Sequence, residues 1–159
     1  MVPALQRYHR APGFLRRNLP AQPPATLTLG NGREHTAETI FALWARGKSE
    51  HTVRAYQQDV ADFALYFSRA LHISPPLSTA AAMDRLFKQS APSAHEIVFL
   101  FREYLTASGL APASVNRHLA TLRSLSKLGR MLGAVAWQLE VPGVRSRKSV
   151  GARLDQRST

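Results

Sequence analysis

The sequence predicts an all-α protein, a compact bundle of four to five helices with flexible arms at both ends. In several segments the apolar residues recur at steps of three and four, the period of a helix with one buried face. Most of these segments follow a Ser or Thr that can cap a helix and precede a Gly or Pro that can end one. With 159 residues, the chain is long enough to bury one hydrophobic core.

The first predicted helix follows a basic arm. Residues 1–35 contain the proline cluster Pro20, Pro23 and Pro24 and few periodic apolar positions, so we expect them to be flexible. Thr36 is a suitable N-cap, and Gly47 can end the helix that follows. The side chains expected largely inside are Ile40, Phe41, Leu43 and Trp44.

Two further helices are expected before residue 90. One begins near Ser49 or Thr52, and its buried stripe comprises Val53, Tyr56, Val60, Phe63, Phe67 and Leu71. After the turn at Pro75 and Pro76, Ser78 can cap an Ala-rich helix that runs to about Lys88.

The fourth predicted helix begins with a capping box, in which the side chains of Ser93 and Glu96 each bond the other residue's exposed backbone N–H. It continues to about Ser108, and Gly109 suits a left-handed C-terminal cap. Its expected core face comprises Ile97, Phe101, Tyr104 and Leu105. Phe99 points the other way, so this helix is either central or touches a partner.

The fifth predicted helix, within residues 111–132, is the most informative segment. It contains five basic groups, counting His118, and no carboxylate. Its apolar side consists of Val115, Leu119, Leu122, Leu125 and Leu132, and its basic side of Arg117, Arg123, Lys127 and Arg130. The small or hydrogen-bonding residues Ala113, Asn116, Ala120 and Ser124 lie on the basic side, where they would let a phosphate backbone approach closely. This pattern favours a nucleic-acid surface, although a solvated basic face is the simpler alternative.

Net charge and residue types narrow the function classes. The formal charge is +11 and the pI about 11.2, which favours a polyanionic partner. The absence of cysteine excludes disulfides and Cys-containing zinc sites, and the six His residues lack metal-binding spacing, so no metal is expected. No apolar run reaches the length of about 20 residues that spans a bilayer. We therefore divide the chain into a basic arm (1–35), a helical DNA-binding domain (36–132) and a basic linker or tail (133–159).

Two segments in this order carry a family resemblance. SEHTVRAYQQDVADFALYF, followed by FREYLTASGLAPASVNRHLATLRSLSKL, resembles the N-terminal core-binding (SAM-like) domain of tyrosine recombinases of the phage integrase and Xer type. The matching positions include Thr52, Tyr56, Asp59, Asn116 and Arg123, and the resemblance covers roughly residues 36–132. It implies a helical bundle that grips duplex DNA during integration and recombination, with two helices against adjacent major grooves.

Ten residues are candidates for DNA contact. The resemblance implies contacts from the helix over 50–70, through Lys48, Thr52, Arg54 and Gln58. The helix over 112–130 is selected by its charge and by the resemblance, and contributes Asn116, Arg117, Arg123, Ser124, Lys127 and Arg130. Base reading is expected from Asn116, Arg117 or Arg123. Ser124 is either a phosphate hydrogen-bond donor or a tolerated small residue.

Catalysis is not expected. The family's catalytic domain, with its Arg, Lys, His and nucleophilic Tyr residues, is not recognisable in this chain, and Tyr8, Tyr56, Tyr66 and Tyr104 lack a matching context. We therefore expect a DNA-associated cytoplasmic protein that binds double-stranded DNA, with no cofactor, no small-molecule substrate and no membrane partner. The alternative is a helical protein-interaction module that binds recombinase subunits, favoured by Phe99, Leu65 and the region around Trp137.

Overall fold

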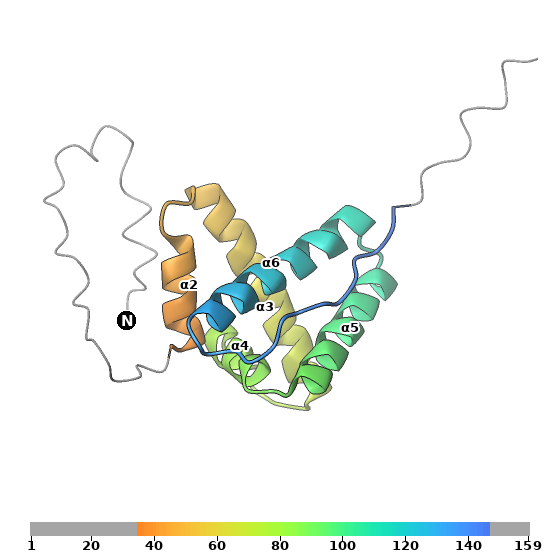
Figure 1. Cartoon of the computed structure of the whole chain (residues 1–159). Coiled ribbons are helices and arrows are strands. Elements are labelled where there is room, and N and C mark those ends of the chain that lie inside the picture. Colours follow the sequence, from red (N-terminus) through yellow and green to blue (C-terminus); the bar gives the residue numbers. More distant parts are fainter. Residues whose placement is uncertain (1–34, 147–159) are drawn as a thin grey trace, which may run out of the picture.

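The computed structural model describes residues 35–146, and it confirms an all-α bundle. Its five helices are α2 (Ala37–Ala45), α3 (Glu50–Ala70), α4 (Thr79–Phe87), α5 (Ala91–Ala107) and α6 (Pro112–Met131). No strand occurs between residues 35 and 146. Helices α3 and α6 cross in the middle of the bundle, with α2 and α4 packed toward one end and α5 along the other (Figure 1).

The predicted helix starts are confirmed at three of the N-termini. The hydroxyls of Thr36, Ser49 and Ser78 each accept a hydrogen bond from a backbone N–H in the first turn of α2, α3 and α4. Such a cap satisfies one of the helix's unpaired N–H groups. The predicted left-handed conformation of Gly109 is also present, with φ of 85°, and Gly47, which was predicted to end the first helix, has φ of 76°.

The predicted start of α5 at Ser93 is wrong. The N-cap is Ser90, whose hydroxyl accepts from the N–H of Ser93, while the Ser93 hydroxyl bonds the side chain of Gln89. Pro92 lies in the first turn, where its missing N–H costs no helical hydrogen bond and its fixed φ suits the helix. The N-cap therefore lies three residues before the predicted one.

The core is built mainly from the predicted stripes. Its largest fully buried side chains include Phe63, Phe101, Ile40, Leu86, Leu119 and Leu122. The rings of Phe63 and Phe101 meet edge to face with centroids 5.3 Å apart, which joins α3 to α5.

Three residues expected in the core are exposed: Leu43, Leu71 and Tyr104. Leu71 lies just past the last residue of α3. The ring of Tyr104 leans on Tyr66 at the edge of the α3–α5 contact, with centroids 5.1 Å apart. Leu43 is exposed although it lies less than one turn after the fully buried Ile40 and directly before the buried Trp44.

The folded unit continues past residue 132, the predicted end of the helical domain. At Gly133, with φ of 78°, the chain turns back and residues 133–146, here called the strap, run in the opposite direction along α6 (Figure 1). Val135, Trp137, Leu139 and Val141 are buried, while the residues between them are exposed. This alternation is that of an extended segment with one covered side. The prediction of a basic tail is therefore corrected for the strap; the predicted arm up to residue 34 and the tail from 147 lie outside the described residues.

None of the helices between residues 35 and 146 is long and apolar enough to cross a membrane.

Candidate nucleic-acid interface

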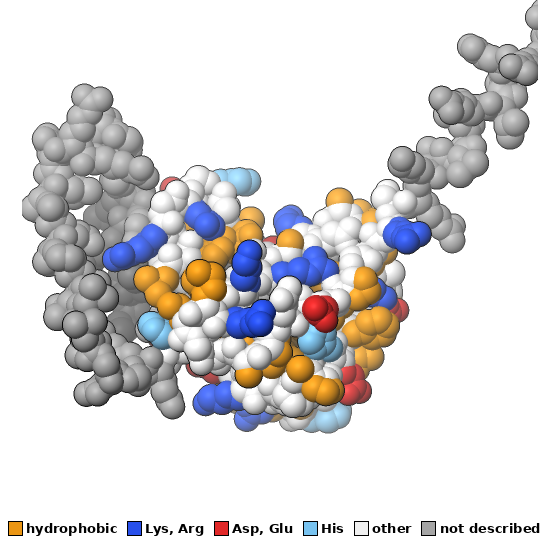
Figure 2. Space-filling model, viewed as in Figure 1, with side chains coloured by type: hydrophobic (Ala, Val, Ile, Leu, Met, Phe, Trp, Pro, Cys, Tyr) orange, Lys and Arg blue, Asp and Glu red, His pale blue; other side chains and the backbone are white. Residues whose placement is uncertain are grey.

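The two sides predicted for α6 are largely confirmed. Val115, Leu119, Leu122 and Leu125 are buried, and Leu132 is half-buried. The exposed residues of the helix include Ala113, Arg117, Ala120, Lys127 and Arg130. On the face seen in Figure 2, Lys and Arg side chains recur across the region of α2 and α6, with apolar side chains between them. None of the four predicted cations is buried within the bundle, although Arg123 is half-covered.

Arg117 is nevertheless paired with a carboxylate from a neighbouring helix. Its Nη2 and Nε donate to Oδ1 of Asp59 on α3, at 3.0 and 3.3 Å. The Arg117 side chain is 54% exposed, whereas Asp59 is 1% exposed. The lack of carboxylates in residues 111–132 is therefore a property of that segment alone, because α3 offsets part of its charge.

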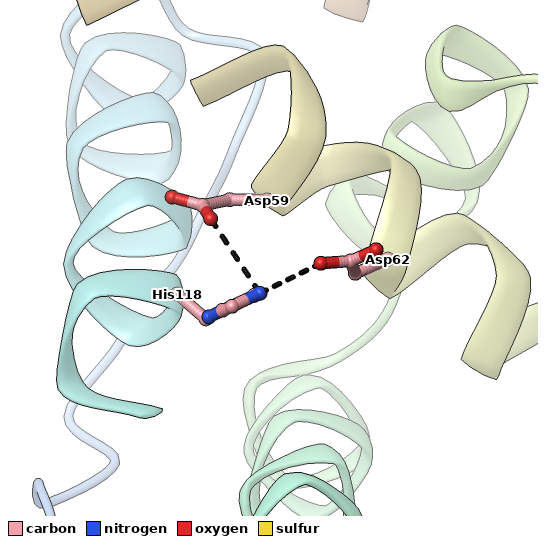
Figure 3. Close-up of side chains that lie close together, drawn as sticks. All are labelled: Asp59, Asp62 and His118. Atoms are coloured by element: carbon pink, nitrogen blue, oxygen red, sulfur yellow. Dashed lines mark hydrogen bonds and ion pairs between the residues drawn. The ribbon is translucent and has the colours of Figure 1, made fainter. Parts of the chain in front are cut away.

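His118, the fifth basic group of residues 111–132, lies inside the bundle and adds nothing to the outward cationic surface. Figure 3 shows its ring directed at Asp59 and Asp62 of α3. Its Nε2 is 2.9 Å from Oδ2 of Asp62 and 3.5 Å from Oδ1 of Asp59, and its Nδ1 is 2.7 Å from the carbonyl of Ser114. Both ring nitrogens therefore lie within hydrogen-bond distance of an oxygen atom.

Together these groups form an ion network between α3 and α6. Oδ2 of Asp59 accepts from the Thr121 hydroxyl at 2.8 Å, and the Gln58 amide donates to Asp62 at 3.0 Å. Two carboxylates thus face one guanidinium and one imidazole, and each buried oxygen of Asp59 has a donor. Such satisfaction is what a buried charge requires.

Two aspartates and a histidine are also residue types that bind metal ions. The ligand atoms of Asp59, Asp62 and His118 lie within 4.8 Å of one another. Arg117 and Thr121, however, already donate to the two oxygens of Asp59, so a cation would have to displace the guanidinium. The contacts therefore favour an internal ion network over a metal centre. The sequence shows the Asp59–Asp62 and His118–Thr121 spacings, each of three residues on one helix face, but not that the two faces meet.

The strap holds three of the predicted DNA-contacting residues of α6. The Asn116 amide nitrogen donates to the carbonyl of Val144 at 2.9 Å, and its oxygen accepts from the N–H of the same residue at 2.7 Å. Arg123 donates to the carbonyl of Val141, and Arg130 donates to the side chain of Gln138 at 3.0 Å. Asn116 and Arg123 are half-buried. The prediction of an open basic side is therefore corrected at both positions, because the chain returns along α6 and covers them in part.

The candidates near the start of α3 have local partners. The Lys48 ammonium lies 4.6 Å from the centre of the Trp44 ring, Thr52 bonds the Ser49 hydroxyl, and Arg54 pairs with Glu50 one turn earlier. Lys48 and Arg54 are exposed, and Thr52 is half-buried. Gln58 and Arg117 join the same ion network from opposite helices. The predicted DNA-contacting residues of α3 and those of α6 are therefore connected through this ion network.

A cavity of about 460 Å³ lies apart from these residues. Its walls come mainly from α2, α3 and α4 and include Ile40, Phe41, Val60, Met83 and Phe87. None of the predicted DNA-contacting residues lines it.

Comparison with known proteins adds no relative: no family model, curated protein or solved structure matches the chain.

Proposed function

We propose that this protein binds duplex DNA through the outward side of α6 and the start of α3, as the core-binding module of a site-specific tyrosine recombinase does. In this role it grips duplex DNA during integration or recombination and does not itself cleave the DNA. The resemblance of residues 36–132 motivates the family, and the exposed surface of α6 supports the location.

The observation that carries the proposal is the composition of that surface. Lys127 and Arg130 are exposed, and Arg117 keeps half of its side chain in solvent while anchored to Asp59. Ala113 and Ala120 lie on the same exposed arc, where their small side chains leave room for a sugar–phosphate strand. Phosphate contacts by such cations supply the sequence-independent part of DNA affinity.

The net positive charge of the chain also favours DNA as the partner, but most of that charge lies outside residues 35–146. Residues 35–146 contain twelve Lys or Arg and eight Asp or Glu, a net charge of +4, so +7 of the total +11 belongs to the residues on either side. A test must therefore separate contacts of α6 from general attraction by the whole chain.

The experiment is a titration of the full chain with fluorescein-labelled duplex DNA at several salt concentrations. If four to six phosphates are neutralised, log affinity should fall against log salt with a slope of about −4 to −5. The double variant Lys127→Gln and Arg130→Gln should flatten that slope by about two units, since each lost phosphate contact contributes about 0.9.

The matched control is Arg85→Gln with Lys88→Gln, which removes the same charge from exposed positions at the end of α4. Its slope should stay close to that of the parent. Equal salt slopes for both double variants would show that α6 does not contact the DNA and that the chain is attracted only by its net charge.

A protein-interaction module is the second candidate. Leu65, Phe99, Leu100 and Tyr104 are exposed on α3 and α5, with Leu100 at 48%, and exposed apolar side chains of this size often mark a partner surface. Trp137 no longer supports this reading, because the strap buries it. Weak binding to DNA that does not respond to salt would favour this candidate over the first.

A further inference from the structure

The strap is anchored differently along its length. In its inner part, residues 135–141, four alternating apolar side chains are buried, and the indole N–H of Trp137 donates to the carbonyl of Gln89 at 2.8 Å. In its outer part, residues 142–146, Pro142, Gly143, Arg145 and Ser146 are exposed and Val144 is half-buried. The inner part is therefore a piece of the core, whereas the outer part contributes little apolar burial.

Polar contacts from two helices hold the outer part. Arg102 of α5 donates to the carbonyl of Pro142 at 2.9 Å, and Asn116 of α6 makes its two hydrogen bonds to Val144. A bond of this kind in a partly exposed place exchanges with bonds to water, so its net contribution is small. The outer part can therefore lift while the inner part stays docked.

Asn116 cannot hold the strap and read DNA at once. Its amide uses one donor and one acceptor on the backbone of Val144, and the same donor–acceptor pair is what an Asn presents to the edge of an adenine. Arg123 differs, because its partner carbonyl belongs to Val141, whose side chain is buried. The competition therefore concerns Asn116 specifically.

We propose that residues 142–146 are a reversible cover over Asn116, which closes in the free protein and opens when duplex DNA occupies α6. This inference rests on the proposed DNA-binding function and adds a regulatory step to it. Charge favours opening on DNA, since Arg145 lies in the cover and residues 147–159 contain four Lys or Arg against one Asp, a positive excess that phosphates attract.

Gly143 offers a perturbation of the cover that leaves every proposed DNA-contacting residue unchanged. A Cβ at this position would lie 2.7 Å from Oδ1 of Asn116, the atom that accepts from the N–H of Val144. Gly143→Ala should therefore push the cover away from Asn116. Ser146→Thr is the control, because it also adds one methyl group to an exposed position of the same segment.

The test combines affinity with amide hydrogen exchange on the full chain. Gly143→Ala should bind duplex DNA about three- to tenfold more tightly with an unchanged salt slope, and Ser146→Thr should match the parent. In the parent protein, saturating DNA should speed exchange at the Val144 amide and leave the hydrogen-bonded amides of Val135 and Glu140 protected.

The outcomes separate the two proposals. If DNA binds, but Val144 stays protected and Gly143→Ala binds no more tightly than Ser146→Thr, the cover is refuted and DNA binding stands. If neither the parent nor Gly143→Ala binds DNA, the proposed function fails and the cover falls with it.

Discussion

Asp59 is the residue whose neutralisation should most clearly test the ion network between α3 and α6. Asp59→Asn keeps the shape of the side chain but removes the charge that faces Arg117, His118 and the Thr121 hydroxyl. Breaking a buried ion pair costs about 3–5 kcal/mol when the remaining charge stays buried and unpaired. Here the cost is smaller, because Arg117 is 54% exposed and can turn to water, and His118 keeps Asp62. We expect a loss of about 2–3 kcal/mol in the free energy of unfolding.

Urea denaturation followed by circular dichroism measures this loss. With a slope of about 2 kcal/mol per molar urea, the midpoint should fall by about 1–1.5 M. The control is Glu103→Gln, which also removes one carboxylate paired with an arginine, but from an exposed position on α5. Exposed pairs contribute about 0–1 kcal/mol, so its midpoint should move little. A loss for Asp59→Asn within about 0.5 kcal/mol of the control would show that the network does not stabilise the α3–α6 contact.

Three further predictions concern the strap, the start of α5 and the half-buried phenol of Tyr66. Trp137→Ala should cost about 3–5 kcal/mol in unfolding free energy, because the indole is 5% exposed and bonded to Gln89; a loss below about 1 kcal/mol in urea denaturation would place the strap outside the core. Ser90→Ala should cost about 1 kcal/mol in the same assay and Ser93→Ala clearly less, and the reverse order would restore the cap predicted from sequence. Burial raises the pKa of the Tyr66 hydroxyl, so the unfolded chain ionises first and stability should fall as pH rises above about 10. Tyr66→Phe should lessen that fall between pH 9 and 11, and an equal fall in both proteins would contradict it.

Local rules account for most of the fold that could be predicted. The caps at Thr36, Ser49 and Ser78 depend on a hydroxyl and the next few residues, so the sequence contains the whole signal. The start of α5 was misplaced because two serines three residues apart both suit a cap, and Pro92 decides between them. The strap was missed because its buried residues alternate over a short stretch, a pattern that does not by itself say where the covering surface is.

The candidate site likewise has features that the sequence predicts and features that depend on distant contacts. The outward side of α6 follows from the helical period, so Lys127 and Arg130 could be placed from sequence. The partners of Arg117 and Asn116 lie 58 and 28 residues away, and they depend on how α3 crosses α6 and on the return of the strap. Contacts at such separations have no local signature, so the restraint on these two side chains was visible only in the structure.

The reversal at Gly133 also decides where an attached probe would sit. Because the chain doubles back, Val144 lies beside Asn116 near the beginning of α6, about 20 Å along the helix axis from its final turn. A dye or fused reporter placed directly after residue 146 would therefore emerge next to the α5–α6 corner instead of the end at which α6 stops. Energy-transfer measurements that assumed the opposite exit would misjudge distances by most of the length of that helix.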